Sequence, residues 1–233
     1  MRLIHPDLQS QVILSENSPA VITVEAPDIF YRLVRQIYAQ AQARDDEGDF
    51  SLSENYKELN ISKEIEVTLN PILIDFGQRK IINRIFSDFD RLAAEPEHLE
   101  ATAELHTSVE KYLARLAVDY PVPVIWSDDF VVSNIVKSMD LAIDVHEMEL
   151  VSRILTYMQL LTSLRLARIF TFVNLKSYLT TEQLIELYHE SRLKKYTLLL
   201  LESRSAPHVE DYEKCLTLDA DLCVVVNDFN EIE

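Results

Sequence analysis

The first regular pattern in the chain is a strand followed by an amphipathic helix. Residues 20–25 alternate and are rich in β-branched side chains, which predicts a strand. Residues 29–43 repeat apolar side chains at helical spacing, and Asp28 is expected to cap the start of that helix. Arg32 and Arg35 lie on its polar side, three residues apart.

A long helical region comes next, after short strand-like segments within residues 60–74. An apolar stripe marks its first helix, with members at Ile81, Ile82, Ile85, Phe86, Phe89 and Leu92. Glu95-Pro96 interrupts the pattern, because proline disfavours helical backbone at the residue before it. A second helix is predicted over residues 97–117. Two helices joined by a tight break form a hairpin, so this region is an arm or bundle and not part of a sheet.

The pattern changes again after the hairpin. Residues 122–126 are strand-like, with Pro123 typical of an edge. Ser127 is expected to cap a helix that runs to about Met139, and residues 145–166 are expected to form another long helix.

Strands of the buried type alternate with helices in the C-terminal third. Continuous apolar runs predict strands over residues 168–173, 196–201 and 222–226. Thr180 and Gln183 form a capping box that opens the helix between the first two. This order predicts parallel pairing with right-handed crossovers. The predicted fold class is therefore α/β, with a parallel-type sheet in a head and an inserted leg of long helices.

Composition excludes several classes of function. The 233 residues include only two glycines, Gly48 and Gly77, whereas phosphate-cradling loops need several glycines close together. The loop at Lys176 and Ser177 lies where a nucleotide-binding protein holds phosphates, but without glycine it is predicted to be an ordinary connection. No stretch resembles a signal peptide or a membrane span, so a cytoplasmic location is expected.

The charge balance limits which partners the chain can hold. Its 22 Lys and Arg residues against 39 Asp and Glu residues give a net charge of −17. This charge argues against bulk adhesion to nucleic acid or to anionic lipid, so any nucleic-acid contact needs basic residues gathered on one surface. Three sets of basic residues stand out on predicted helices: Lys80, Arg84 and Arg91 on the first leg helix, Arg32 and Arg35 on the N-terminal helix, and Lys137 on the short helix. Each set is either a solvated helix face or a contact to DNA phosphates.

The C-terminal third resembles a known family. Phe172-Val173-Asn174 ends a strand, Tyr178-Leu179-Thr180 opens a helix, and residues 199–204 read Leu-Leu-Leu-Glu-Ser-Arg. With the order of elements over residues 120–205, this pattern resembles the type II-A CRISPR spacer-acquisition accessory family. The resemblance implies a head similar to a degenerate nucleotide-binding fold without a phosphate loop, into which a helical leg is inserted.

That resemblance also sets the expected domains. Residues 1–70 form the first part of the head, residues 71–118 form the helical leg, and residues 119–233 form the second part of the head. The helix over residues 145–166 is expected to extend toward the leg.

The resemblance implies a function without catalysis. Members of this family form tetrameric rings that hold the ends of linear double-stranded DNA and support spacer acquisition in bacterial antiviral defence. Their partners are the CRISPR adaptation integrase and the RNA-guided effector nuclease. The positions that match DNA contacts on the inner wall of the ring are Arg32, Lys80, Arg84 and, best of all, Lys137, and Arg35 and Arg91 belong to the same basic sets.

Calcium is the one cofactor that the resemblance implies. Well-known members carry a dense carboxylate segment just before the short helix, whereas residues 120–126 here contain no carboxylate. Only Asp119, Asp128 and Asp129 flank the segment, and calcium takes roughly 6–8 oxygen ligands. These three residues are the metal candidates. The alternative is that Asp128 and Asp129 stabilise the start of a helix, because their carboxylates interact with the positive end of its dipole.

Two other functions fit the sequence. The acidic surface suits a protein–protein adaptor that docks a basic partner without binding DNA. The α/β pattern also suits a degenerate nucleotide-binding protein. If the chain is instead a ring with its cations turned inward, an acidic outer face would favour threading of DNA from an end over side-on adhesion.

Overall fold

The computed structural model describes residues 1–205, 209 and 212–227. The chain divides into two compact units. We call Met1–Asp75 with Val145–Glu233 the head, and Phe76–Asp144 the leg. The leg continues to Asp144, whereas its predicted end was residue 118.

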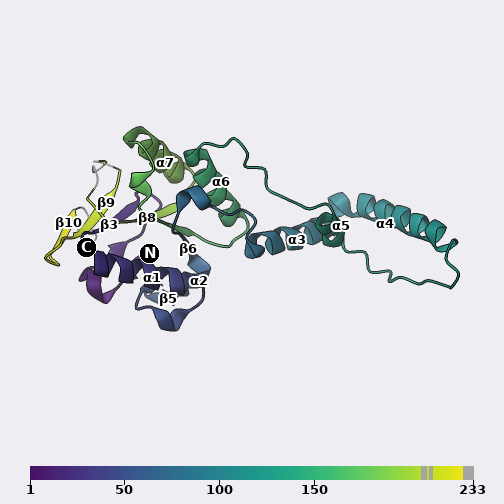
Figure 1. Ribbon diagram of the computed structural model, residues 1–233, viewed down its shortest axis with the longest axis horizontal. Helices are drawn as coiled ribbons and strands as arrows, with labels where there is room; N and C mark the ends of the chain where they lie inside the picture. Colours follow the sequence, from purple (N-terminus) through teal and green to yellow (C-terminus); the bar gives the residue numbers. More distant parts are fainter. Residues whose placement is uncertain (206–208, 210–211, 228–233) are drawn as a thin grey trace. The chain divides into compact units, whose positions relative to one another are not determined.

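Six strands among the described residues form the main sheet of the head, in the order β10-β9-β3-β8-β7-β6 (Figure 1). They are β3 (Ala20–Val24), β6 (Ile65–Thr68), β7 (Ile169–Val173), β8 (Thr197–Glu202), β9 (Lys214–Leu218) and β10 (Val224–Asn227). The strands from β9 to β6 are parallel neighbours, and β10 is antiparallel to β9. The α/β class is therefore confirmed, as is parallel pairing for β7 and β8.

The parallel prediction is wrong for the last strand. β10 follows β9 after only the short connection of residues 219–223. A parallel neighbour needs a crossover of a dozen or more residues, so this connection can only turn the chain back into a hairpin.

Helices cover both faces of this sheet (Figure 1). α1 (Pro27–Ala41) and α2 (Ile61–Glu64) lie on one face, and α6 (Leu150–Ser163) and α7 (Thr181–Leu193) lie on the other. Every residue of β3, β7 and β8 is buried, as expected for strands covered on both sides. Each fully buried leucine or isoleucine contributes about 1.5–3 kcal/mol, so these three strands form the main stabilising layer.

Local sequence signals predicted the start of one of these helices correctly and the starts of two others incorrectly. The capping box of Thr180 and Gln183 at the start of α7 is confirmed. The predicted Asp28 cap is wrong, because α1 begins at Pro27 with Ala26 as its cap, and Asp28 lies in the first turn. α6 begins at Leu150 and not at residue 145, since Glu147 has a φ of 64° that a helix cannot contain.

The head contains a second sheet, on the side of the main sheet that α1 covers. Its four strands among the described residues run antiparallel in the order β2-β1-β4-β5. They are β1 (Arg2–Ile4), β2 (Val12–Ile13), β4 (Ser51–Glu54) and β5 (Lys57–Leu59). Leu3, Val12 and Leu52 from this sheet join the core beneath α1. Sequence patterns did not predict the sheet, because strands of two to four residues are too short to show alternation.

Within the described residues of the head, four short 3-10 turns connect other elements: η1 (Pro6–Leu8), η2 (Asp45–Glu47), η3 (Pro71–Leu73) and η4 (Leu175–Ser177). The last of these follows β7 directly, at the carboxyl end of the parallel strands.

The leg contains α3 (Arg79–Ala93), α4 (Pro96–Ala117) and α5 (Val132–Ser138). The predicted break is confirmed at Glu95, whose extended backbone separates α3 from α4, with Pro96 in the first turn of α4. α5 packs on α3, and the Ser133 backbone N–H donates a 2.8 Å hydrogen bond to Asp90 Oδ1. Over the part of the chain that the structure describes, no helix is both long and apolar enough to traverse a bilayer.

Two predictions for the leg are wrong. Residues 122–126 form no strand, because no neighbouring segment pairs with them. The short helix begins at Val132, with Val131 and not Ser127 as its cap. The Ser127 hydroxyl instead accepts a hydrogen bond from the Asp129 backbone N–H at 3.1 Å, which closes a local turn ahead of the helix.

Candidate nucleic-acid interface

α3 carries the most concentrated positive charge on the leg. It contains Arg79, Lys80, Arg84 and Arg91 against only Asp88 and Asp90, whereas the leg as a whole has seven basic and twelve acidic residues. At 3.6 residues per turn, Lys80, Arg84 and Arg91 lie within about 40° of one another around the helix. All three are exposed. The predicted row on α3 is therefore present, and we call these three residues the α3 row.

Arg91, the last member of the row, is engaged in ion pairs. Its guanidinium contacts Glu95, and its Nε lies 3.6 Å from Asp88 Oδ1. The side chain is 60% exposed, and exposed pairs of this kind contribute only about 0–1 kcal/mol. Arg91 can therefore exchange these partners for a phosphate at little cost. All three residues of the α3 row remain candidates for phosphate contact.

Lys137 lies away from the α3 row. It belongs to α5, and its ammonium sits 5.2 Å from the centre of the Phe86 ring. The helical repeat places Phe86 about 120° around α3 from Lys80 and about 160° from Arg84. Lys137 is exposed, so it presents a second basic position on another side of the leg.

The remaining basic candidates are in the head. Arg32 and Arg35 are both exposed on α1. Arg32 donates from its Nε to Asp7 Oδ2 at 2.8 Å, and a terminal nitrogen lies 2.7 Å from the same oxygen. Its charge is therefore partly used to join α1 to the turn after β1, while Arg35 faces solvent.

The three candidate metal ligands do not form a metal site. Asp119, Asp128 and Asp129 are all exposed. Across the described residues, no group of three or more His, Cys, Asp or Glu side chains is placed to hold a metal ion. Asp129 instead accepts a 3.0 Å hydrogen bond from the Ser127 hydroxyl. The residues present in this segment do not fit calcium, which needs several converging oxygens.

The loop at Lys176 and Ser177 lies where a nucleotide-binding protein holds phosphates. Here its polar groups pair with carboxylates of the protein itself. Lys176 is only 5% exposed, and its Nζ lies 2.6 Å from Glu213 Oε1. Its backbone N–H donates to Glu202 Oε1 at 3.1 Å, and the Tyr188 hydroxyl donates to Glu213 Oε2 at 2.9 Å. The lysine and the backbone N–H that a nucleotide phosphate would need are therefore already paired with carboxylates.

Burial perturbs two groups of this cluster. Desolvation raises the pKa of Glu202 to about 7, although backbone N–H groups of η4 and the charge of Lys176 act in the opposite direction. Desolvation and the neighbouring Glu213 carboxylate raise the pKa of Tyr188 far above its usual value. Glu202 therefore exchanges a proton near neutral pH, while Tyr188 stays a hydrogen-bond donor.

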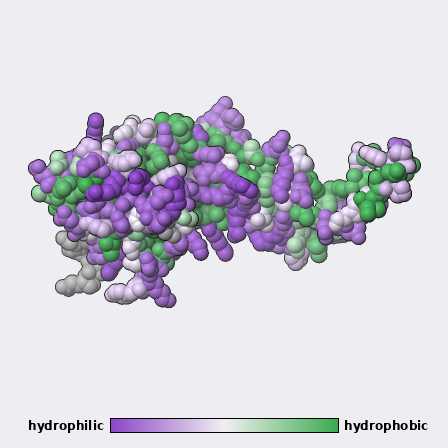
Figure 2. All heavy atoms as spheres, turned by 60° about the horizontal axis from the view of Figure 1, so that its bottom comes forward, coloured by the Kyte–Doolittle hydropathy of each residue, from purple (hydrophilic) through white to green (hydrophobic). Residues whose placement is uncertain are grey.

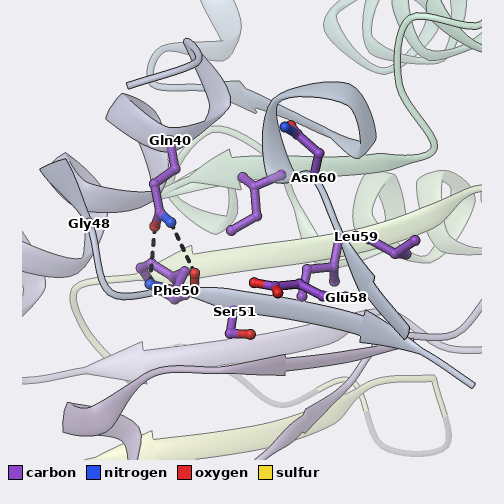
Figure 3. Close-up of a pocket in the computed structure, with 9 residues that line it drawn as sticks. Gln40, Gly48, Phe50, Ser51, Glu58, Leu59 and Asn60 are labelled. Atoms are coloured by element: carbon purple, nitrogen blue, oxygen red, sulfur yellow. Dashed lines mark hydrogen bonds between the residues drawn. The ribbon is translucent and has the colours of Figure 1, made fainter. Parts of the chain in front are cut away.

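A hollow of about 470 Å³ opens beside the second sheet (Figure 3). Its rear wall is the Gln40 side chain, which donates to the Phe50 carbonyl at 2.9 Å and accepts from the Phe50 N–H at 3.1 Å. A Cβ at Gly48 would lie 2.5 Å from the Gln40 amide oxygen, so close approach explains this glycine. The lining contains the Glu58 carboxylate but no lysine or arginine, which does not suit a phosphate ligand.

Residues 42–222 match the protein family described as CRISPR-associated protein (Cas_Csn2). The chain belongs to this family. The family resemblance that residues 172–204 indicated is thus confirmed.

One solved structure is similar to the chain in fold. The crystal structure of Stu0660 of Streptococcus thermophilus aligns with a TM-score of 0.58 and 9% sequence identity. The alignment covers 97% of the present chain and 76% of Stu0660. A bacterial Atm1-family ABC exporter with ATP bound shares 12% identity over 91% of the chain and 33% of the exporter, with a TM-score of 0.39. No curated protein shows a significant match.

The leg of this Cas_Csn2 protein also has an exposed apolar face, which was not predicted from the sequence. α4 has no buried residue. Its exposed apolar side chains share one side of the helix, spanning about 140° at 3.6 residues per turn; they are Leu99, Leu105, Tyr112, Leu113 and Leu116. Figure 2 shows hydrophobic side chains at the surface of the leg. An apolar stripe of this length on a 22-residue helix is typical of a surface that packs against a partner.

The buried carboxylate of Glu202 gives a testable dependence of stability on pH. A raised folded pKa stabilises the fold below the ordinary pKa of about 4.5, and this stabilisation is lost as pH rises through about 7. The difference is on the order of 3 kcal/mol. Glu202→Gln removes the charge, so its stability relative to the unchanged protein should increase from pH 5 to pH 8. Thermal unfolding at both pH values measures this change.

The exposed Glu16 provides the matched control, because Glu16→Gln makes the same chemical change at the surface. Its relative stability should be the same at both pH values. An equal pH response in the two variants would contradict the burial argument for Glu202.

Proposed function

We propose that this CRISPR-associated protein holds the ends of linear double-stranded DNA, without catalysis, and so supports the acquisition of new spacers. The observation that carries the proposal is the α3 row: a chain with a net charge of −17 concentrates exposed cations along one side of a single helix. Phosphate contacts need no more than this, because they position DNA without reading its sequence. Family membership supports the CRISPR context.

A ring-shaped homotetramer is part of the proposal. The exposed apolar face of α4 supplies a surface that a second copy can cover. In such an assembly, the acidic exterior repels DNA that approaches side-on, and the cations of the α3 row attract DNA that enters through the opening. The CRISPR adaptation integrase and the RNA-guided effector nuclease are the proposed partners, in the bacterial cytoplasm.

The other two functions are less well supported. Nucleotide binding is disfavoured because Lys176 and the η4 backbone are already paired with Glu213 and Glu202. A protein–protein adaptor is favoured by the same α4 face and by the acidic surface, so DNA binding itself is the measurement that separates the adaptor from the proposed role.

Reversing two charges of the α3 row should weaken DNA binding. The double substitution Lys80→Glu and Arg84→Glu removes two phosphate contacts and adds repulsion, so affinity for a linear duplex should fall at least about tenfold at low salt. The slope of log affinity against log salt should shrink by about 2. Fluorescence anisotropy across a salt series measures both quantities.

Lys111 and Arg115 of α4 provide the control with the same change of charge. Both are exposed and lie outside the row, so Lys111→Glu with Arg115→Glu should retain most of the affinity. Equal losses in the two double variants would mean that total charge, and not the α3 row, determines binding.

Topology of the DNA tests threading directly. Linear duplex should bind more tightly than closed circular duplex of the same length at matched salt, because a circle offers no end. Binding should also weaken steeply as salt rises. Equal affinity for the two forms in a gel-shift titration would rule out entry from an end while leaving phosphate contact possible.

Charging the α4 face should disrupt the assembly. Leu105→Glu with Leu116→Glu places two carboxylates on the apolar stripe, and a tetramer should dissociate to smaller species in sedimentation velocity. Leu193→Glu, at an exposed leucine of α7, should leave the oligomer unchanged. A monomer in the unchanged protein would contradict the ring.

A further inference from the structure

A tight hairpin in the head presents an aromatic ring almost fully to solvent. β4 and β5 are joined by Asn55 and Tyr56 alone, with Glu54 paired opposite Lys57. Both turn residues have positive φ, 50° and 62°, as the type I′ turn requires. The second position of this turn favours glycine, because any Cβ is strained there. The chain nevertheless places a tyrosine at the tip, and Tyr56 is 96% exposed.

No packing within the head accounts for this tyrosine. Positive φ occurs at other non-glycine residues of the described chain, but Tyr56 is the one aromatic residue among them. A ring that is 96% exposed buries no area to offset the strain of its backbone. The side chain is therefore better explained by something that binds it than by the stability of the hairpin.

The surroundings of the ring define what it can bind. The Arg2 guanidinium lies 5.9 Å from the centre of the Tyr56 ring, within the range of a cation–π contact. Beside the pair is a hollow of about 350 Å³ that is also lined by Ser53, Glu54 and Asn55. Its dimensions fall in the range of small-molecule sites, about 300–1,000 Å³. The hollow thus combines an aromatic face, a cation, an amide and a hydroxyl group.

Charge favours an anionic ligand with a flat ring. Glu54, the one carboxylate in the lining, lies 3.7 Å from the Arg168 guanidinium, which also pairs with Glu64. Arg2 is the one arginine or lysine in the lining, and the adjacent Lys57 is also exposed. A cationic ligand would be repelled by Arg2, whereas a nucleotide offers a base to stack on the ring and a phosphate for the cation.

We propose that Tyr56 and Arg2 form a stacking site for an unpaired nucleobase. Tyr56 stacks on the base, Arg2 contacts the phosphate attached to it, and Ser53 and Asn55 offer hydrogen bonds to the edge of the base. The inference rests on the proposed function in one respect, namely that the unpaired base belongs to a frayed or overhanging end of the DNA. It assigns the head a contact with the terminus itself, separate from the phosphate contacts of the α3 row.

The test compares a blunt duplex with the same duplex carrying a short single-stranded overhang. The unchanged protein should bind the overhang about fivefold more tightly, since stacking of a base on an exposed aromatic ring is at the lower end of its usual range. A 2-aminopurine in the overhang should lose fluorescence on binding as it stacks. Equal affinity for the two duplexes, with no change in fluorescence, would overturn the site.

Tyr56→Gly is the decisive variant, because glycine relaxes the turn while it removes the ring. It should keep the affinity for blunt duplex, lose the preference for the overhang, and unfold at a temperature no lower than that of the unchanged protein. Tyr56→Phe should retain the preference. A large drop in the unfolding temperature of Tyr56→Gly would show that the ring is structural and would overturn the proposal.

A single-stranded oligonucleotide with a terminal 2-aminopurine separates this inference from the proposed function. Quenching by the unchanged protein but not by Tyr56→Gly supports the stacking site even if no blunt duplex binds, in which case only the duplex-holding role fails. Absence of quenching overturns the stacking site, even where blunt duplex still binds through Lys80 and Arg84.

Discussion

Three parallel strands whose residues are all buried determine how the other elements must be arranged. β3, β7 and β8 expose almost nothing, and β8 alone buries four consecutive leucines from Leu198 to Leu201. Such strands are stable only if helices cover both faces of the sheet, and parallel neighbours must be joined by long crossovers. One of these crossovers, between β6 and β7, contains the entire leg. The leg can carry surface chemistry because it is not needed to bury the sheet.

The polar cluster at the strand ends is a consequence of the same burial. Glu202 ends a buried strand, and Glu213 and Lys176 are almost completely enclosed beside it. A buried charge is costly unless it is paired, so the lysine, the tyrosine hydroxyl and the η4 backbone satisfy the two carboxylates. These pairings consume the groups that would otherwise hold a nucleotide phosphate. At Lys176, both the ammonium and the backbone N–H are therefore paired with carboxylates.

Basic and acidic residues are not evenly distributed over the surface of the protein. The chain is strongly acidic, yet α3 carries four basic residues against two acidic ones, and the β4–β5 hairpin holds Tyr56 beside Arg2. The proposed role depends on this division, because phosphate contacts work only where cations are not diluted by nearby carboxylates. Arg91 and Arg32 illustrate the dilution, since each is already paired with an acidic neighbour.

Features that depend on neighbours along the chain could be predicted from the sequence. Helical spacing predicted α1, α3 and α4, the Glu95-Pro96 break separated the leg helices, and the residues from Phe172 to Arg204 were enough to recognise the family. The glycine count alone excluded a phosphate loop. The polar contacts between elements became visible only in the folded chain: Lys176 is buried against Glu213, Lys137 lies over Phe86 away from the α3 row, and Tyr56 stands beside Arg2. Periodicity reports the local backbone and the buried face of an element, whereas these contacts join residues that are far apart in the chain or on different elements, so their energies leave no pattern in the sequence.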